Sequence, residues 1–168
     1  PTFSKAGDWK SPVVPVVLRG TRSKLRGGTW FPRPGDVAVL SPGIKEVAPV
    51  RATIAASASE VIGEVELFYR LRPPESPILA ITGTDGKSTV TTMLGDIVAA
   101  SGRPVWVGGN LGNPLCTGLD EITAETVVVA EVSCFQLTTC VDFRPRVAVV
   151  TNIAEDHIDY HGGFEAYQ

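Results

Sequence analysis

The sequence predicts an α/β fold built around a parallel β-sheet. Short apolar runs of strand length are separated by a segment of helical composition and by turns, and the runs are apolar throughout rather than at every second residue. Strands with that pattern belong in a sheet covered by helices on both faces. The chain has 168 residues, of which 43% are hydrophobic, so it can hold one complete domain or a domain and part of a second.

The first regular pattern lies in residues 36–40, an apolar run that ends at Ser41-Pro42-Gly43. This combination predicts a buried strand followed by a turn. Further along, apolar side chains recur at helical spacing over residues 60–71, and Ser59 stands where a helix cap is expected. We therefore predict a helix over residues 60–71.

Stacked prolines separate this helix from the rest of the chain. Pro73 and Pro74 cannot continue a helix, and residues 73–77 form a stiff segment that suits neither neighbouring element. We expect a domain boundary here, so that residues 36–72 close a first domain and residues 78–168 form part of a second.

The second domain alternates strands with helical segments. A helix is predicted over residues 87–101, with Gly102 as its stop signal. Strands are predicted at four short apolar runs rich in β-branched side chains, residues 78–81, 104–107, 126–130 and 147–150.

Charge is unevenly distributed. Residues 1–35 carry seven Lys or Arg and one Asp, whereas the remainder holds 8 basic and 17 acidic residues. A basic arm can bind nucleic acid, but these basic residues alternate with Pro and Gly and lack a pattern of aromatic stacking residues. We therefore leave residues 1–35 unassigned and expect no nucleic-acid partner.

Composition also bears on the compartment. The longest apolar runs fall short of the roughly 18 residues that a membrane helix needs, and the first residues lack the pattern of a secretory leader. The three cysteines, Cys116, Cys134 and Cys140, form neither a metal-type pair nor an even disulfide framework. We expect a cytoplasmic protein that contacts no membrane.

The strongest local motif is Thr82-Gly-Thr-Asp-Gly-Lys-Ser-Thr89, between a predicted strand and a predicted helix. Its glycines let backbone N–H groups converge on a phosphate, and the helix N-terminus adds partial positive charge. Lys87 can reach the outer phosphates, and Ser88 offers a hydroxyl to Mg²⁺. The full phosphate-loop pattern is not met, because Ile81 stands where its first glycine belongs, but the context on both sides predicts a nucleoside triphosphate cradle.

Two further strand ends carry polar side chains. Glu131 follows the run at residues 127–130, and the run at 147–150 leads into Glu155, Asp156, His157, Asp159 and His161. Because parallel strands end at one edge, we expect these groups and the phosphate loop to converge on one pocket. Glu131 is a candidate magnesium ligand, and His157 can ligate a metal or contact a substrate.

Two other patterns are weaker. His157 and His161 are four residues apart, but Ile158 occupies the position of the glutamate in the H-E-x-x-H zinc motif, so zinc hydrolysis is not expected. Residues 108–112, Gly-Gly-Asn-Leu-Gly, follow a predicted strand and would allow a ligand to approach the backbone beside the Asn110 amide.

Taken in order, these segments resemble the Mur ligases. The resemblance rests on residues 82–89, 108–112, 131–137 and 151–159, and covers about residue 36 to the end. Gly-Gly-Asn and Ser-x-Phe-Gln-Leu point to the branch that joins D-glutamate to UDP-N-acetylmuramoyl-L-alanine, rather than to its siblings or to folylpolyglutamate synthetase. The implied fold is the end of a Rossmann-like N-terminal domain followed by the first half of a P-loop parallel-sheet domain that binds ATP.

The resemblance also implies site residues. Lys87 would act on the transferring phosphate and His157 on the metal and substrate side, in a reaction that passes through an acyl phosphate. Magnesium would be held by Ser88, Glu131 and His157. The UDP-linked substrate would contact Ser41, Asn110, Ser133 and Gln136. ATP would lie in the loop formed by Gly83, Thr84, Asp85, Gly86, Lys87, Ser88 and Thr89.

Some features depart from the family pattern. Asp85 stands where asparagine is usual and Cys134 where a second serine is usual, and residues 1–35 lack the family's first glycine-rich turn. The family's carbamylated lysine would fall just after Gln168. We therefore expect a partial, monomeric chain, with three alternatives: an ATP-binding remnant without turnover, a ligase of the folylpolyglutamate synthetase type, or a nucleic-acid binder.

Overall fold

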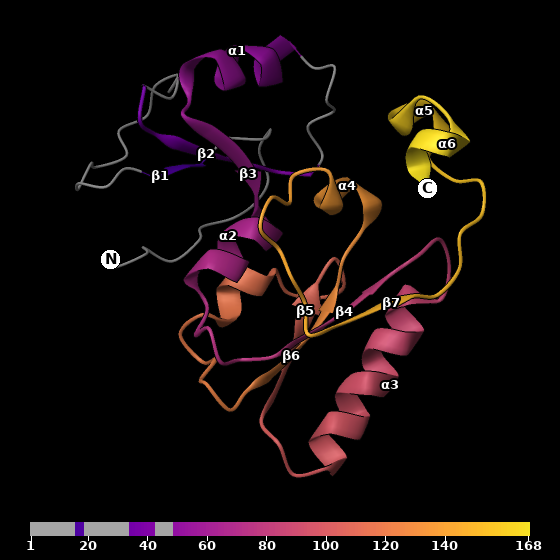
Figure 1. Ribbon diagram of the computed structural model, residues 1–168. Helices are drawn as coiled ribbons and strands as arrows, with labels where there is room; N and C mark the ends of the chain where they lie inside the picture. The colour runs from indigo at the N-terminus through magenta and orange to yellow at the C-terminus, as the bar shows by residue number, and fades with distance from the viewer. Residues whose placement is uncertain (1–15, 19–33, 43–48) are drawn as a thin grey trace.

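The computed structural model describes residues 16–18, 34–42 and 49–168 and contains two β-sheets (Figure 1). The unassigned basic segment, residues 1–35, lies almost wholly outside the described residues. No helix in the described part is both long and apolar enough to cross a membrane.

The first sheet is small and lies near the N-terminal part of the chain. Its order is β1 (Val16–Leu18), β2 (Val37–Leu40) and β3 (Glu60–Gly63), with β1 antiparallel and β3 parallel to β2. Helix α1 (Pro49–Ser57) connects β2 to β3. Ala38, Leu40 and Ile54 form the buried core between α1 and the sheet.

The predicted helix over residues 60–71 is wrong in its first turn. Residues 60–63 form strand β3, and helix α2 (Glu64–Leu71) begins after it. Ser59 caps no helix, because its N–H and hydroxyl both donate to the carbonyl of Asp36. Val61 and Ile62 pair with β2 instead. Sheet pairing thus overrides a pattern that also fits a helix.

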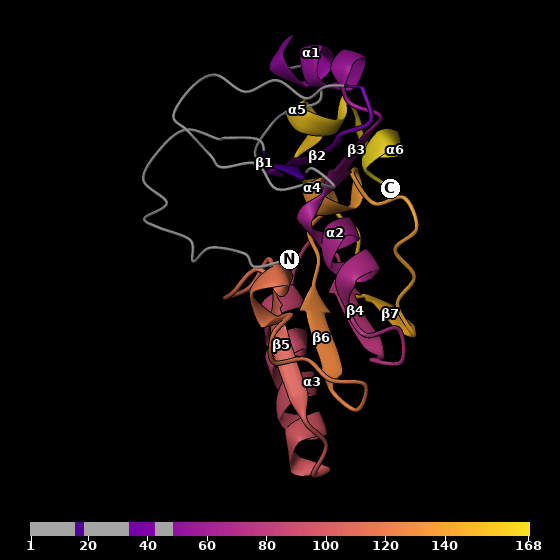
Figure 2. The same cartoon turned by 90° about the vertical axis from the view of Figure 1, so that its left-hand side faces the viewer.

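The second sheet is parallel and has the order β5-β6-β4-β7, which Figure 2 displays from left to right. Its strands are β4 (Ile78–Thr82), β5 (Val105–Gly109), β6 (Val127–Glu131) and β7 (Val147–Val150). The four predicted strands are confirmed, with ends displaced by no more than two residues. Strand β6 is buried along its whole length, whereas Val147 and Val150 of the edge strand β7 are exposed.

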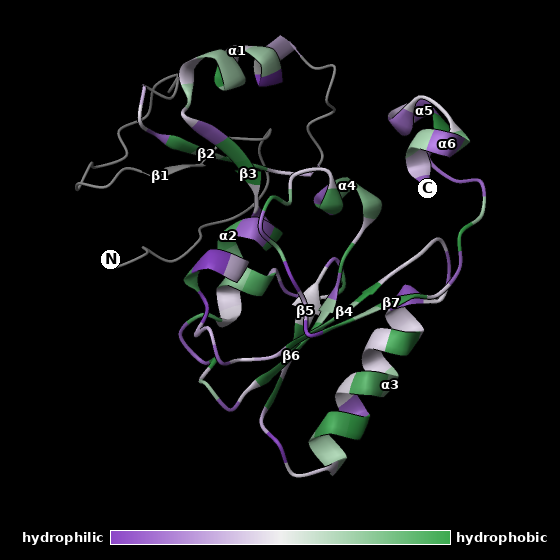
Figure 3. Cartoon of the chain, in the orientation of Figure 1, coloured by the Kyte–Doolittle hydropathy of each residue, from purple (hydrophilic) through white to green (hydrophobic). Residues whose placement is uncertain are grey.

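Helices cover both faces of this sheet, as predicted. Helix α3 (Lys87–Ala100) packs on one face, and α2 with the 3-10 helix η1 (Leu115–Gly118) packs on the other. Figure 1 shows α2 and α3 on opposite sides of the sheet, and Figure 3 shows apolar colour on β4, β6 and several turns of α3. Val90, Leu94 and Val98 of α3 pack against the sheet. Gly102 adopts φ +79 directly after α3 and ends it, as predicted.

Helix α2 belongs to the core of the second sheet. Val65 and Phe68 are fully buried and pack in one cluster with Ile78, Leu115 and Val128. Residues 73–77 form a tight turn, in which the Ser76 N–H donates to Pro73 and its hydroxyl to Thr126. Side chains on both sides of the prolines therefore share a single core, and the boundary at 73–77 stays a prediction.

Three short helices follow strand ends. They are α4 (Cys134–Leu137) after β6, and α5 (Ile158–His161) and α6 (Phe164–Tyr167) after β7. All three lie toward the carboxyl ends of the strands, the edge at which the phosphate-loop motif also lies (Figure 1).

Candidate functional site

The motif that follows β4 forms a tight loop at the N-terminus of α3. Gly83 has φ +131 and Gly86 has φ +78, both in the region that favours glycine. A Cβ on Gly83 would lie 2.1 Å from the Thr151 hydroxyl oxygen, so this position also requires glycine for close packing. A Cβ on Gly86 would meet no atom within 4 Å, which leaves the space in front of the helix N-terminus open.

Hydrogen bonds fix this loop to the exit of β7. The N–H of Thr84 donates to the Asn152 carbonyl at 3.0 Å, and the N–H of Asp85 donates to the Asn152 side chain at 3.0 Å. In return, Thr151 and Asn152 donate to the Asp85 carbonyl at 2.6 and 3.0 Å. The loop is thus held in shape by its neighbour, which reduces the cost of ordering it around a ligand.

The α3 N-terminus has the properties of an anion site. Its N-cap, Gly86, has no side chain to cap the first N–H groups, so these donors and the helix dipole face outward. The Lys87 ammonium donates to the carbonyls of Gly83 at 2.7 Å and Thr84 at 2.6 Å. Ser88 and Thr89 lie in the exposed first turn. Positive charge and free donors therefore gather here.

Glu131 ends β6 and is 1% exposed. Its Oε1 accepts a hydrogen bond from the Asn110 amide at 2.6 Å, whereas its Oε2 is buried and has no partner among the described residues. The Asn110 N–H donates to the Glu131 carbonyl, and Gly109 fits only because it lacks a Cβ. A buried carboxylate oxygen without a donor is costly, and a cation bound there would offset that cost.

Ser133 and Gln136 are brought together, but they bond to each other. The Ser133 hydroxyl accepts from the Gln136 N–H, and the Gln136 side-chain oxygen accepts from the Ser133 N–H at 2.9 Å, which forms a capping box for α4. Both residues are 8% exposed. They therefore have a structural function, and their predicted contact with a substrate stays a prediction. Ser41 is exposed directly after β2.

His157 lies at the exit of β7 in a left-handed conformation, with φ +50. Its ring centroid is 4.6 Å from that of Phe135 in α4, and its Nε2 is 3.3 Å from Asp156. His161 also stacks against Phe135, at 5.9 Å. Within the described ranges, no three His, Cys, Asp or Glu side chains gather as a metal site, and the magnesium set of Ser88, Glu131 and His157 contains only two such side chains.

The surroundings of Cys134 indicate that the exits of β4, β6 and β7 lie close together. Burial raises the pKa of its thiol, Lys87 acts to lower it, and Asp156 acts to raise it. Groups from the exits of β4 and β7 therefore both act on a thiol at the exit of β6. This proximity supports the predicted convergence of the exits of β4, β6 and β7. None of the contacts described above joins Glu131 directly to the loop at residues 83–89.

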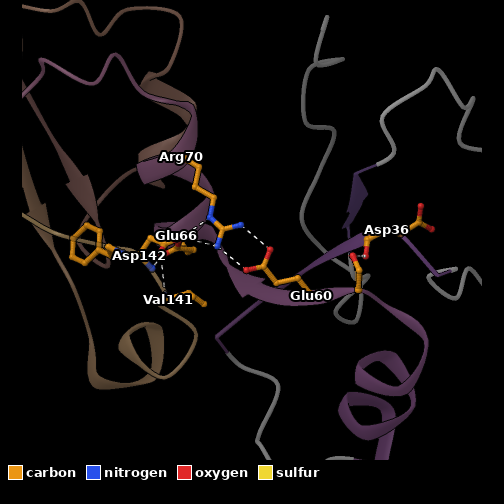
Figure 4. A network of polar contacts seen from close by, with 8 residues as sticks. Asp36, Glu60, Glu66, Arg70, Val141 and Asp142 are labelled. Atoms are coloured by element: carbon orange, nitrogen blue, oxygen red, sulfur yellow. Dashed lines mark hydrogen bonds and ion pairs between the residues drawn. The ribbon is translucent and has the colours of Figure 1, made fainter.

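Two features were missed from the sequence. The Tyr167 hydroxyl in α6 lies 2.8 Å from the Thr84 hydroxyl and so contacts the phosphate loop. A second network surrounds the fully buried Glu66 of α2, which accepts from Arg70 and from the N–H groups of residues 141–143 (Figure 4). The four-residue spacing of Glu66 and Arg70 was an available signal for their ion pair, but nothing local indicated residues 141–143.

The comparison with known families decides the identity of this fold. A model described as the Mur ligase middle domain matches residues 81–168, more than half of the chain. The chain belongs to the Mur ligase family. In this Mur ligase chain, the matched region begins in β4 and includes the phosphate loop, Glu131 and the β7 exit.

Curated relatives agree with this assignment. The chain is 46% identical over 132 residues to UDP-N-acetylmuramoylalanine--D-glutamate ligase of Desulfatibacillum aliphaticivorans, and 48% identical over 132 residues to that of Desulfosudis oleivorans. The alignments cover 79% of this chain and 29% and 28% of those proteins. This Mur ligase chain therefore spans less than a third of the length of the relatives it matches.

Solved structures give a weaker likeness. One is UDP-N-acetylmuramate:L-alanyl-gamma-D-glutamyl-meso-diaminopimelate ligase from Neisseria meningitides, which is 19% identical with a TM-score of 0.49. The match covers 78% of this chain and 45% of that one.

Proposed function

We propose that this chain is part of an ATP-dependent ligase that joins D-glutamate to UDP-N-acetylmuramoyl-L-alanine during synthesis of the peptidoglycan precursor. The observation that carries the proposal is the pairing of a glycine loop at an uncapped helix N-terminus with a buried, half-unpartnered carboxylate at the next strand exit. The names of the curated relatives supply the substrate pair. We also propose a cytoplasmic, monomeric protein.

The residues present fit ATP and magnesium. The first turn of α3 offers unbonded N–H groups beside Lys87, and the space in front of Gly86 is open. The unpartnered Oε2 of Glu131 suits a hard divalent cation, which prefers carboxylate and hydroxyl oxygens. When bound, ATP supplies the phosphoryl group that activates a carboxylate for attack by an amine.

The chain's own residues would bind and orient the reactants. Residues 83–89 would hold the phosphates, and Lys87 would leave the carbonyls of Gly83 and Thr84 to pair with phosphate oxygens. Ser88, Glu131 and His157 would hold magnesium. Such positioning and neutralisation of charge is what phosphoryl transfer demands of a protein.

Substrate contacts would come from the edge around Glu131. Asn110 is exposed, and its side-chain amide donates to Glu131, which fixes the orientation of that amide. Ser133 and Gln136 would contact the UDP-linked substrate from the first turn of α4, and Ser41 would do so from the first sheet. Because Ser133 and Gln136 also cap α4, their substitution would affect both binding and local stability.

A binding experiment tests the nucleotide site directly. Lys87→Ala should weaken binding of Mg·ATP to the chain by at least about tenfold, because one charged partner of the phosphates is lost. Isothermal titration calorimetry measures the change. Arg103→Ala, which removes an exposed positive charge beyond the other end of α3, is the matched control and should leave binding unchanged. Equal binding by the Lys87→Ala chain would contradict the assignment of the loop.

A chimera tests the ligase reaction. The matching 132 residues of the Desulfatibacillum aliphaticivorans relative would be replaced by those of this chain. We expect phosphate release that requires both UDP-N-acetylmuramoyl-L-alanine and D-glutamate, and its loss on Lys87→Ala but not on Arg103→Ala. A folded chimera that binds Mg·ATP but releases phosphate with neither substrate would contradict the proposed reaction while leaving the nucleotide site intact.

A further inference from the structure

A second pocket lies at the opposite edge of the second sheet. It has a volume of about 420 Å³ and lies where the chain enters β4 and β7. Its walls are two segments, residues 72–78 and 144–146. Strand β4 has five residues, and at roughly 3.3 Å per residue its two ends are about 13 Å apart. The pocket is therefore separate from the phosphate loop at the other end of the strand.

The pocket is strongly basic. Its charged lining residues are Arg72, Arg144, Arg146 and Glu75, an excess of two positive charges. Arg144 and Arg146 are exposed, and within the described residues neither guanidinium forms an ion pair or a side-chain hydrogen bond. Two unpaired guanidinium groups on one wall repel each other, and an anion between them would relieve that repulsion.

Arg72 is held in place on the other wall. Its guanidinium carbon lies 4.5 Å from the centroid of the Tyr69 ring, and its Nη1 donates to the Pro73 carbonyl at 3.1 Å. Its Nε is shielded from solvent and has no hydrogen-bond partner in the described part of the chain. A donor that is buried without a partner costs free energy, so a ligand acceptor would be favoured here.

The backbone around the pocket is rigid. The Arg146 N–H donates to the Ile78 carbonyl at 2.7 Å, and the Ser76 hydroxyl donates to the Thr126 carbonyl at 2.7 Å. Pro74, Pro77 and Pro145 also line the pocket, and proline fixes the backbone further. The three arginines are thus carried by a scaffold that does not have to be ordered when a ligand binds.

We propose that this pocket binds a small, free oxyanion of the phosphate and diphosphate class. Guanidinium groups present paired N–H donors that match phosphate oxygens, and several of them around one pocket favour a compact anion with more than one charge. Glu75 stands at the same rim and would repel negative charge on that side, so the anion is expected to lie against the arginines. The site differs from the proposed ATP loop in its position and in its residues.

Inorganic diphosphate is the probe, and the Lys87→Ala chain is the protein, so that the phosphate loop contributes as little as possible. NMR spectra of ¹⁵N-labelled protein follow the backbone amides of Arg144 and Arg146 and the side-chain Nε–H of Arg72. We expect saturable shifts of these signals. Arg144→Ala with Arg146→Ala should weaken binding by at least about tenfold, whereas Arg103→Ala should not change it.

Controls keep this test independent of the proposed function. Among the described residues, the side chains of Arg144 and Arg146 form no hydrogen bond or ion pair with the folded core. Unchanged spectral dispersion of the double variant would verify its fold. Sulfate at equal ionic strength should bind more weakly than diphosphate. Shifts confined to residues 83–89, shifts that do not saturate, or equal binding by the double variant would overturn the pocket. Failure of the unsubstituted chain to bind Mg·ATP would bear on the proposed function alone.

Discussion

Two regions of the molecule bury a glutamate almost completely, and they treat it in opposite ways. Glu66, where α2 meets residues 141–143, is 0% exposed and accepts four hydrogen bonds, three from backbone N–H groups and one from Arg70. Glu131, at the carboxyl end of β6, is 1% exposed and accepts one bond on Oε1 and none on Oε2 within the described chain.

The difference separates a structural carboxylate from a candidate functional one. Oε2 of Glu66 fixes the turn at residues 141–143 against α2, and Oε1 accepts from Arg70. Arg70 extends the network to Glu60 in the first sheet at 2.7 Å (Figure 4). Glu131 has only one of its two oxygens satisfied, so its burial is compensated less well than that of Glu66. Proteins retain such unfavourable groups where activity needs them.

The largest expected effect is on Glu66. Glu66→Ala should reduce the free energy of unfolding by roughly 3 kcal/mol or more, because it leaves three N–H groups without an acceptor and Arg70 without its buried partner. Urea denaturation followed by circular dichroism measures the loss. Glu60→Gln, which removes only the partly exposed end of the network, should cost less than about 1 kcal/mol.

The pH dependence of this region follows from the same bonds. Burial acts to raise the pKa of Glu66, but the Val141 and Asp142 N–H groups and Arg70 together lower it below its usual value. A carboxyl with a lowered pKa in the folded state stabilises above its unfolded pKa and loses that contribution as pH falls. The wild-type chain should therefore lose more stability on acidification than Glu66→Gln. An equal loss in both would contradict the structural role.

Glu131→Gln should differ from Glu66→Ala, because it should change stability little and weaken ligand binding. The Gln oxygen can still accept from Asn110, and a buried charge is removed, so the free energy of unfolding should change by less than about 1 kcal/mol or rise. Binding of Mg·ATP should weaken by about tenfold, since a charged metal ligand is lost. Paired denaturation and calorimetry measure both effects. If Glu131→Gln were unstable but bound Mg·ATP normally, Glu131 would be a structural residue like Glu66, and the proposed difference between them would be wrong.

Glu64 is an intermediate case and gives the smallest expected effect. Burial raises its pKa, and the hydrogen bond from the Cys116 N–H only partly opposes this. A carboxyl with a raised pKa is destabilising above that pKa, and stability increases as pH falls through it. The free energy of unfolding of Glu64→Gln should therefore exceed that of the unsubstituted chain by up to about 1 kcal/mol near pH 8. The variant should also lack the increase in stability that the unsubstituted chain shows as pH falls. Thermal melts from pH 5 to 8, with the exposed Glu75→Gln as control, would reveal it.

Much of the second sheet could be predicted because each of its strands has a recognisable local sequence pattern. Short continuous apolar runs rich in β-branched side chains, such as residues 127–130, favour a strand buried on both faces, and the polar Glu131 marks the exit of this one. Residues 60–63 could not be assigned in this way, since their apolar spacing suits a helix as well as a strand. Only the pairing of Val61 and Ile62 with β2 decides between the two.

The candidate site was predictable to the same degree. Parallel strands end at one edge, so the loop at residues 83–89, Glu131 and His157 could be grouped from the order of strands and exits alone. Contacts that join distant segments could not. Thr84 meets Tyr167 in α6, and Glu66 meets residues 141–143, across more than 70 residues of sequence in each case. The capping box also showed that Ser133 and Gln136 bond to each other.

The strand order has a consequence for how this chain acquires its structure. Strand β4 lies between β6 and β7, and Ile78 pairs with Val128 while Leu79 pairs with Val147. During synthesis β4 leaves the ribosome well before either neighbour exists, and closing such long loops is slow. The apolar β4 must therefore remain unpaired on both edges until β6 has been synthesised, and on one edge until synthesis has passed β7. A chaperone that binds extended apolar segments would have its longest opportunity there.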